Sequence, residues 1–272
     1  MHIPRAWARL SAEGQTVWGW GDDEAGARRE ATSRLQRLLE RVRRGEPFPG
    51  AYAYGSRPLK EEILQTFEDG ASRPPAAMLT RNGYGAVVLN TARLLFLDVD
   101  VPPPTAMQRL ARVFGSRRAG APEAVVQRLR EALRQVGGAT FRLYRTASGL
   151  RAMAIDREFD PAGHDTQALM KATDTDPAFA RLCLVQRSFR ARLTPKPWRC
   201  HCPIPPSEHP RLDPELGRRF ADWLAEYERA SSRYATCRYL ETIGSAAPRG
   251  ATARLVELHD RVTRCQEALP LA

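Results

Sequence analysis

The sequence lacks the features of membrane-spanning and secreted proteins. No stretch of its 272 residues approaches the roughly 18 consecutive apolar residues of a membrane-spanning helix. The first seven residues have no apolar core of the kind that a secretory signal needs. Internal repeats and low-complexity tracts are also missing, while 43% of the residues are hydrophobic, which is enough for a packed core. We therefore expect a globular, cytoplasmic protein with no membrane partner.

Cysteine is scarce, and this excludes a disulfide scaffold. The chain has five cysteines, an odd number, and no secretory signal, so free thiols are the expected state. One group of possible zinc ligands stands out, because Cys200 and Cys202 flank a histidine and His209 follows seven residues later. The C-x-C spacing is tighter than that of most zinc sites. Structural zinc at Cys200, Cys202 and His209 is therefore an alternative to packed thiols.

Lysine is rare in an otherwise basic chain. The sequence has 42 basic and 31 acidic residues, a formal net charge of +11, and only Lys60, Lys171 and Lys196 as lysines. Because codon bias also produces a preference for arginine, the position of the charges matters more than their sum. The surplus is concentrated in residues 105–151 and 187–199, and the second segment has five basic residues and no acidic one. This distribution predicts an anionic partner, with nucleic acid as the first candidate.

Hydrophobic patterns predict an α+β protein. Strands are expected at 16–20, 77–80, 86–89, 93–100, 140–145 and 151–155, with a hairpin turn at Asn82-Gly83. Helical spacing of apolar residues predicts helices after Asp23, after Pro58, at 123–136, and at about 165–192, 213–234 and 250–268. The expected organisation is an N-terminal α/β segment (1–75), a core with a mixed or antiparallel sheet packed by helices (76–200), and a mostly helical C-terminal region (201–272).

Two aspartates end the most apolar of these strands. Residues two apart on a strand project from the same face, so the carboxylates of Asp98 and Asp100 are expected side by side. Such a pair repels unless a cation neutralises it, and the usual cation is a hard divalent ion shared with substrate phosphates. We therefore predict that Asp98 and Asp100 are catalytic and bind Mg²⁺ or Mn²⁺. The alternative is that one aspartate caps the next element and the other is solvated.

Basic residues farther along the chain predict a phosphate site. The Ser-Gly turn at 146–149 would expose N–H groups and a hydroxyl, which suit phosphate oxygens. In the segment 187–199, Phe189 and Trp198 alternate with cations, the mixture used to bind nucleotides and single strands. An ordinary hairpin and a solvated basic loop are the alternatives. The predicted phosphate- or nucleotide-binding residues are Arg145, Ser148, Arg151, Arg190, Arg192, Lys196 and Arg199.

Together these motifs resemble the archaeo-eukaryotic primase–polymerase superfamily. The segment 98–100 is similar to its first metal motif and the segment 146–151 to its second, and the resemblance covers about residues 76–200. It implies an RRM-like sheet, nucleic acid and nucleoside triphosphate as partners, and metal-dependent nucleotidyl transfer. Where the family has a histidine after the Ser-Gly turn, this chain has Arg151, Ala152 or Met153. Candidates for the family's third metal carboxylate are Asp156, Asp160 and Asp165.

Functions from different classes fit these observations. The first is nucleotidyl transfer, with Asp98 and Asp100 holding the metal and the basic residues holding triphosphate or template. The second is a catalytically inactive, arginine-rich protein that binds nucleic acid or a protein partner. A D-x-D glycosyltransferase is a further alternative, although residues 16–44 form no convincing nucleotide-binding unit. A phosphohydrolase that uses Thr146 is another, although Asp98 lies late in the chain for that class.

Overall fold

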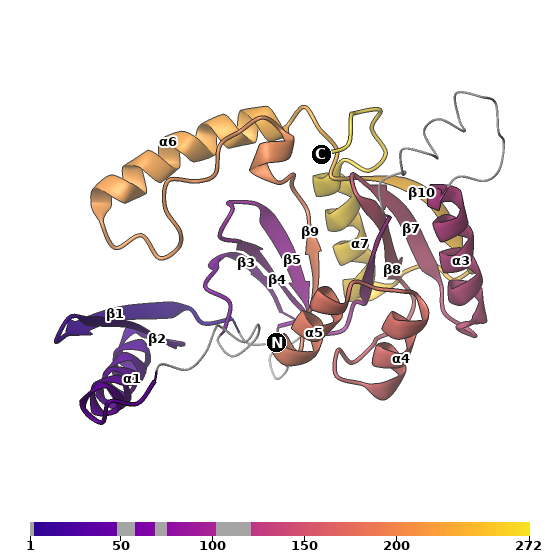
Figure 1. Cartoon of the computed structure of the whole chain (residues 1–272). Helices are drawn as coiled ribbons and strands as arrows, with labels where there is room; N and C mark the ends of the chain where they lie inside the picture. Colours follow the sequence, from indigo (N-terminus) through magenta and orange to yellow (C-terminus); the bar gives the residue numbers. More distant parts are fainter. Residues whose placement is uncertain (1–2, 48–57, 69–74, 102–120) are drawn as a thin grey trace.

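The protein is an α+β protein, as the sequence predicts. The structure, a computed structural model, describes residues 3–47, 58–68, 75–101 and 121–272 (Figure 1). These residues form six α-helices, one short 3₁₀ helix and three antiparallel sheets. In the described parts of the chain, no helix combines the length and the hydrophobicity that a membrane-spanning segment requires.

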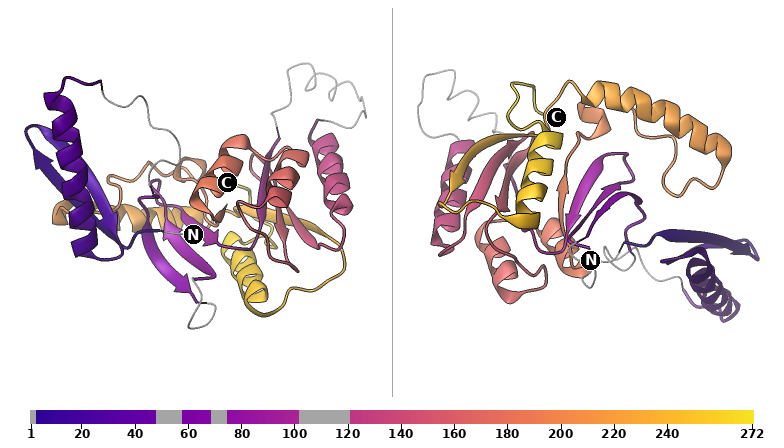
Figure 2. Two further views of the ribbon diagram at one scale, coloured as in Figure 1. Left: turned by 90° about the horizontal axis from the view of Figure 1, so that it is seen from below. Right: turned by 180° about the vertical axis from the view of Figure 1, so that it is seen from behind.

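The N-terminal residues form a hairpin covered by one helix. Strands β1 (Ala6–Ala12) and β2 (Gln15–Gly21) pair with each other, and α1 (Glu24–Arg43) follows after Asp23, whose carboxylate accepts a hydrogen bond from Gly26 N. A Cβ atom on Gly19 would lie 2.1 Å from the backbone nitrogen of Ala31, so only glycine allows this close packing. The predicted order of strand and helix is confirmed, and this unit stands to one side of the other sheets (Figures 1 and 2).

One four-stranded sheet has the order β3-β4-β5-β9. Its strands are β3 (Glu62–Phe67), β4 (Ala77–Arg81), β5 (Val87–Thr91) and β9 (Phe189–Arg192). The hairpin of β4 and β5 is confirmed. The helix predicted after Pro58 is wrong, because residues 62–67 pair with β4 instead. Short apolar runs such as Ile63 to Phe67 do not by themselves distinguish a helix from a strand.

The other four-stranded sheet has the order β10-β7-β8-β6. Strand β6 (Phe96–Asp100) lies at one edge, the hairpin of β7 (Phe141–Thr146) and β8 (Gly149–Ala154) in the middle, and β10 (Cys237–Ile243) at the other edge. Helix α3 (Ala121–Gln135) precedes β7. Strands β6, β7 and β8 lie where the sequence predicts strands. Strand β10 was not predicted, so the region 201–272 is not helical throughout.

The remaining helices pack around these sheets. The predicted helix at 165–192 is in fact α4 (His164–Ala172), α5 (Pro177–Gln186) and then strand β9. Helix α6 (Pro214–Ser231) lies across the top of Figure 1, and α7 (Gly250–Thr263) lies between the two four-stranded sheets (Figures 1 and 2). The main hydrophobic core joins both sheets and α7, with Leu89, Leu97 and Leu255 among its members.

Candidate functional site

Asp98 forms an ion pair with Arg151 across the sheet. The two residues lie directly opposite each other on β6 and β8. Arg151 donates from Nε to Oδ1 of Asp98 at 2.8 Å and from Nη2 to Oδ2 at 3.1 Å, and its side chain is only 3% exposed. Burial by itself lowers the pKa of Arg151, but the charge and hydrogen bonds of Asp98, with smaller contributions from Cys237 and Tyr144, together raise this pKa above its ordinary value. Both oxygens of Asp98 are therefore engaged by a buried cation.

This ion pair does not fit a metal site built on Asp98. Asp100 shares the face of Asp98 and is exposed at the end of β6, but a cation bound by Asp98 would have to share its carboxylate with the positive charge of Arg151. Of the candidates for a third carboxylate, Asp156 accepts from Thr140 N and Asp160 from Ala162 N, while the Asp165 side chain is fully exposed beside His164. Across the described ranges, no group of three or more His, Cys, Asp or Glu side chains is placed to hold a metal. The predicted Mg²⁺ or Mn²⁺ stays a prediction.

Three cations gather beside this pair, and we call Arg192, Lys196 and Arg199 the cation cluster. Burial, followed by the charges of Arg151 and Arg199, lowers the pKa of Arg192 to about 10. Burial and the charges of Arg192 and Arg199 likewise lower the pKa of Lys196, against the opposing charge of Asp100. These mutual effects mean that the three cations lie close enough to repel one another.

The cation cluster has buried hydrogen-bond donors without an acceptor among the described residues. Arg192 Nε and Arg199 Nη1 are buried and have no hydrogen-bond partner among the residues that the structure describes. The other amino group of Arg199, Nη2, donates to Ser148 Oγ at 3.1 Å, so the Ser-Gly turn does reach the cluster. A buried donor without an acceptor is costly. Repelling cations with unused N–H groups form a site that an anion would stabilise.

Two of the predicted phosphate-binding arginines lie elsewhere. Arg190 is buried in the β3-β4-β5-β9 sheet, where its Nη2 donates to Glu61 Oε1 at 2.7 Å. Arg145 lies opposite Leu150 on β8, whereas Arg151 lies opposite Tyr144, so the two arginines project from opposite faces of the sheet. The structure therefore does not bring Arg145 and Arg190 to the cation cluster, because the register between strands, which local sequence does not show, decides the face and the partner.

An exposed aromatic pair borders the cation cluster. Trp198 is 49% exposed and Tyr84 is 44% exposed, and their ring centroids lie 5.5 Å apart in an edge-to-face arrangement. Lys196 Nζ lies 5.4 Å from the centroid of the Trp198 ring. Phe189, the other aromatic residue predicted to stack on bases, is completely buried in the core. The sequence therefore identified one of the two exposed rings and missed Tyr84, which belongs to the β4–β5 turn.

A scan against models of protein families, a search of curated proteins and a search of solved structures each find no match. The function of the chain is therefore inferred from the geometry and charge of its own residues.

Helix α6 holds the segment that carries the cation cluster. Tyr227 on α6 forms hydrogen bonds through its hydroxyl with Thr194 Oγ1 and with the Pro195 carbonyl, at 2.8 and 2.7 Å. The Tyr227 ring stacks on Trp223, whose Nε1 donates to the Pro203 carbonyl. Burial of an apolar helix face thus fixes residues 194–203 at both ends, and Lys196 and Arg199 project from a preorganised loop.

The zinc ligands predicted from the sequence are not brought together. Cys200 and Cys202 are buried in the small apolar cluster under α6, and burial raises the pKa of both thiols. His209 lies instead among Glu62, Arg211 and Lys60, and burial lowers its pKa. The structure therefore gives no support to a zinc site at Cys200, Cys202 and His209, and packed free thiols fit these contacts.

A buried polar network on α7 was not predicted. Asp260 accepts hydrogen bonds from Arg142 Nη2 at 2.6 Å and from the Tyr144 hydroxyl at 2.7 Å, and His259 Nδ1 lies 3.0 Å from its Oδ1. The His259 ring is fully buried against Tyr144 and Phe96. Tyr144 and Arg142 are 116 and 118 residues from Asp260 in the chain, so no local sequence pattern predicts these contacts. The network joins α7 to the face of the sheet that carries Arg151.

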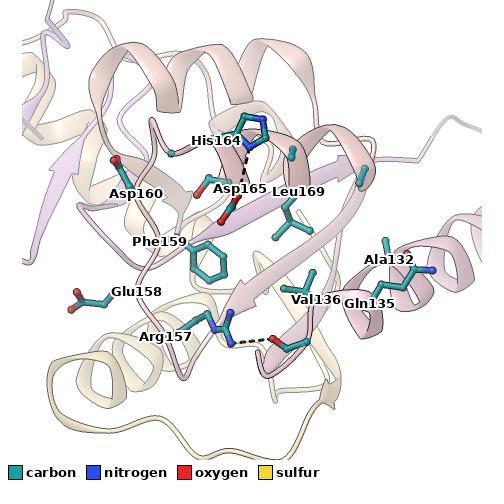
Figure 3. A pocket seen from close by; sticks show the side chains of 15 residues that line it. Ala132, Gln135, Val136, Arg157, Glu158, Phe159, Asp160, His164, Asp165 and Leu169 are labelled. Atoms are coloured by element: carbon teal, nitrogen blue, oxygen red, sulfur yellow. Dashed lines mark hydrogen bonds and ion pairs between the residues drawn. The ribbon is translucent and has the colours of Figure 1, made fainter.

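A cavity of about 790 Å³ lies away from these residues, between the end of α3 and α4 (Figure 3). Phe159, Val136 and Leu169 form its apolar part. Arg157 donates to the Gly137 carbonyl at 3.1 Å, and the side chains of His164 and Asp165 are almost fully exposed at its edge. These polar groups do not converge on the cavity, so we place the candidate site at the cation cluster.

Proposed function

We propose that the chain binds nucleic acid, with the cation cluster holding the phosphates. The observation that carries this proposal is that Arg192 and Arg199 have buried N–H groups without acceptors in the described residues, while both repel Lys196. Phosphate oxygens would accept those hydrogen bonds and reduce the repulsion at once. The carboxylate of Asp98 does not compete, because Arg151 already engages it.

A polyanion suits this site better than a small neutral ligand. The chain has a formal net charge of +11, so its overall charge attracts a long anion. Lys196 and Arg199 lie on a surface loop, and the exposed Trp198 between them leaves the loop accessible. Several phosphates in a row could therefore contact the loop.

The test is binding of fluorescein-labelled DNA and RNA oligonucleotides, followed by fluorescence anisotropy at several salt concentrations. We expect K196A and R199A to weaken binding and to lower the slope of log K against log salt by about 0.7–0.9 for each phosphate that the variant no longer neutralises. K171A is the matched control, because Lys171 is exposed on α4, which lies apart from η1 and the loop around it (Figure 1). Equal affinities and slopes for cluster and control variants would refute the proposal.

Nucleotidyl transfer stays a prediction beside this proposal, as do the primase–polymerase resemblance and the D-x-D glycosyltransferase. The observation that favours nucleotidyl transfer is that Asp98 and Asp100 lie on one face of the strand, with Asp100 exposed near Lys196. A primer-extension assay with Mg²⁺ or Mn²⁺ and nucleoside triphosphates tests it. Incorporation that D100N abolishes would establish the enzyme; binding without incorporation would leave the nucleic-acid-binding protein.

A further inference from the structure

The aromatic pair Tyr84 and Trp198 is held rigidly although it is exposed. Tyr84 lies in a turn in which Asn82 Oδ1 accepts hydrogen bonds from the backbone N–H groups of Tyr84 and Ala86, both at 3.1 Å. Gly85, with φ of 85°, lies so close to Trp223 that an added Cβ would be 2.2 Å from that ring. The turn is therefore fixed in conformation and anchored on α6.

The partner ring is fixed from the other side. Trp198 belongs to the 3₁₀ helix η1 (Pro197–Arg199), and the Pro197 carbonyl accepts hydrogen bonds from Cys200 N at 3.0 Å and Cys202 N at 2.9 Å. Pro195 and Pro197, on either side of Lys196, restrict the backbone of the loop further. Two residues 114 positions apart in the sequence thus present a preformed aromatic surface, and little conformational entropy is lost when a ligand binds it.

One cation lies over this surface, and a second follows Trp198 in the chain. Lys196 Nζ is 5.4 Å from the Trp198 ring centroid, and Arg199 is the next residue in the chain. An aromatic ring with cations close by is the combination that binds a nucleotide, in which a flat base is joined through a sugar to a phosphate. In an edge-to-face pair the edge of one ring covers a face of the other, so each ring keeps a face that points away from its partner.

We infer that Trp198, supported by Tyr84, stacks on an unpaired base, so that the chain recognises single-stranded nucleic acid. This inference rests on the proposed function, because it assumes that the cation cluster holds the phosphates. Bases in a duplex stack on one another and hide their faces, whereas unpaired bases expose them. The aromatic pair therefore supplies the preference for single strands, and the cation cluster supplies the attraction to any nucleic acid.

The experiment compares one labelled oligonucleotide as a single strand, as a duplex and with abasic sites, in DNA and RNA forms. We expect W198A to weaken single-strand binding at least about fivefold and to leave duplex binding unchanged, because the variant cannot stack on a base. W198F should keep part of the affinity. Binding of the single strand should quench tryptophan fluorescence in the wild-type protein, and W198A should remove that change. L212A, at an exposed apolar residue of a loop, is the control.

The outcomes separate this inference from the proposed function. Loss of binding in K196A and R199A with no change in W198A would refute stacking and leave phosphate binding intact. Equal affinity of the wild-type protein for single strand, duplex and abasic strand would also refute stacking. Absence of binding to every oligonucleotide would refute both. If W198A weakens binding of both DNA and RNA single strands, stacking is supported. A difference between the wild-type affinities for DNA and RNA would then show which sugar the protein prefers. Circular dichroism of each variant checks that it is folded.

Discussion

Arg151 joins the two four-stranded sheets, because the guanidinium that engages Asp98 on β6 also donates from Nη1 to the carbonyl of Arg192 on β9, at 3.0 Å. One buried side chain thus fixes both the Asp98 carboxylate on β6 and the β9 backbone at Arg192 in the cation cluster. The ion pair is therefore part of the framework of the site, and removing either partner should lower the free energy of unfolding.

The substitution D98A should lower the free energy of unfolding by about 3 kcal/mol, because it leaves the buried Arg151 without its counter-charge. Urea unfolding measures this. The control is E13A, since Glu13 and Arg43 form an ion pair in which both side chains are more than half exposed. Loss of that pair should change stability by less than about 1 kcal/mol. A D98A protein as stable as the control would mean that Asp98 is free in solution and available to a metal.

The substitution G85A should destabilise the protein more than G14A. Both glycines have positive φ, so each alanine incurs a backbone cost of about 1 kcal/mol. Only at Gly85 would the new Cβ also collide with a neighbour, Trp223, while Gly14 has open space around it. The collision adds about 1–3 kcal/mol. Thermal or urea unfolding of the two variants compares them, and similar losses would contradict the packing of the turn on α6.

Stability should fall as the pH decreases from about 7 to about 5. Burial lowers the pKa of His259 and of His209 below the usual value for histidine. The unfolded chain therefore takes up protons at a higher pH than the folded protein does, and the loss reaches at most about 1.4 kcal/mol per pH unit for each histidine. Burial alone would raise the pKa of Asp260, but hydrogen bonds from His259 and Tyr144 outweigh it and keep this carboxylate charged.

The variant H259Q identifies the origin of this pH dependence. It should unfold with a flatter dependence on pH than the wild-type protein, in urea titrations at several pH values. H164Q, at a residue whose side chain is almost fully exposed, should leave the slope unchanged. If H259Q keeps the full slope, His259 is not the group that takes up the proton.

The five thiols should be unreactive in the folded protein. All five are buried and free, and burial raises the pKa of Cys183 and Cys265 to about 12 and that of Cys237 to about 11. Iodoacetamide at about pH 8 should therefore modify none of them until urea is added, because thiolates are the reactive form. Mass spectrometry counts the modified cysteines. Rapid labelling of Cys200 or Cys202 alone would show that α6 detaches from the loop beneath it.

Local sequence patterns were sufficient where one segment carries its own signal. The apolar run that ends at Asp98 and Asp100 is strand β6, and the Ser148-Gly149 turn does join two strands. Asn82-Gly83 likewise lies between paired strands. In each case the residues that define the element are neighbours in the chain, so their periodicity and turn residues predict it without a tertiary structure.

Pairings between distant segments could not be predicted from local sequence patterns. Arg151 pairs with Asp98 because β8 lies beside β6 in one register, and a shift of one residue would have turned it to the other face. Strand β10 pairs with β7 although about 90 residues separate them in the chain. The cation cluster was largely anticipated, because Arg192, Lys196 and Arg199 are close in sequence, but Tyr84 meets Trp198 only through the fold.

The order of strands along the chain also has a consequence for synthesis. Strand β9 completes the β3-β4-β5-β9 sheet only after β6, β7 and β8 of the other sheet have been made, and β10 completes that second sheet later still. Neither sheet can therefore close on the ribosome as an independent early domain. A nascent chain that stops before Cys237 would carry the cation cluster while β7 still had an open edge, a form exposed to aggregation.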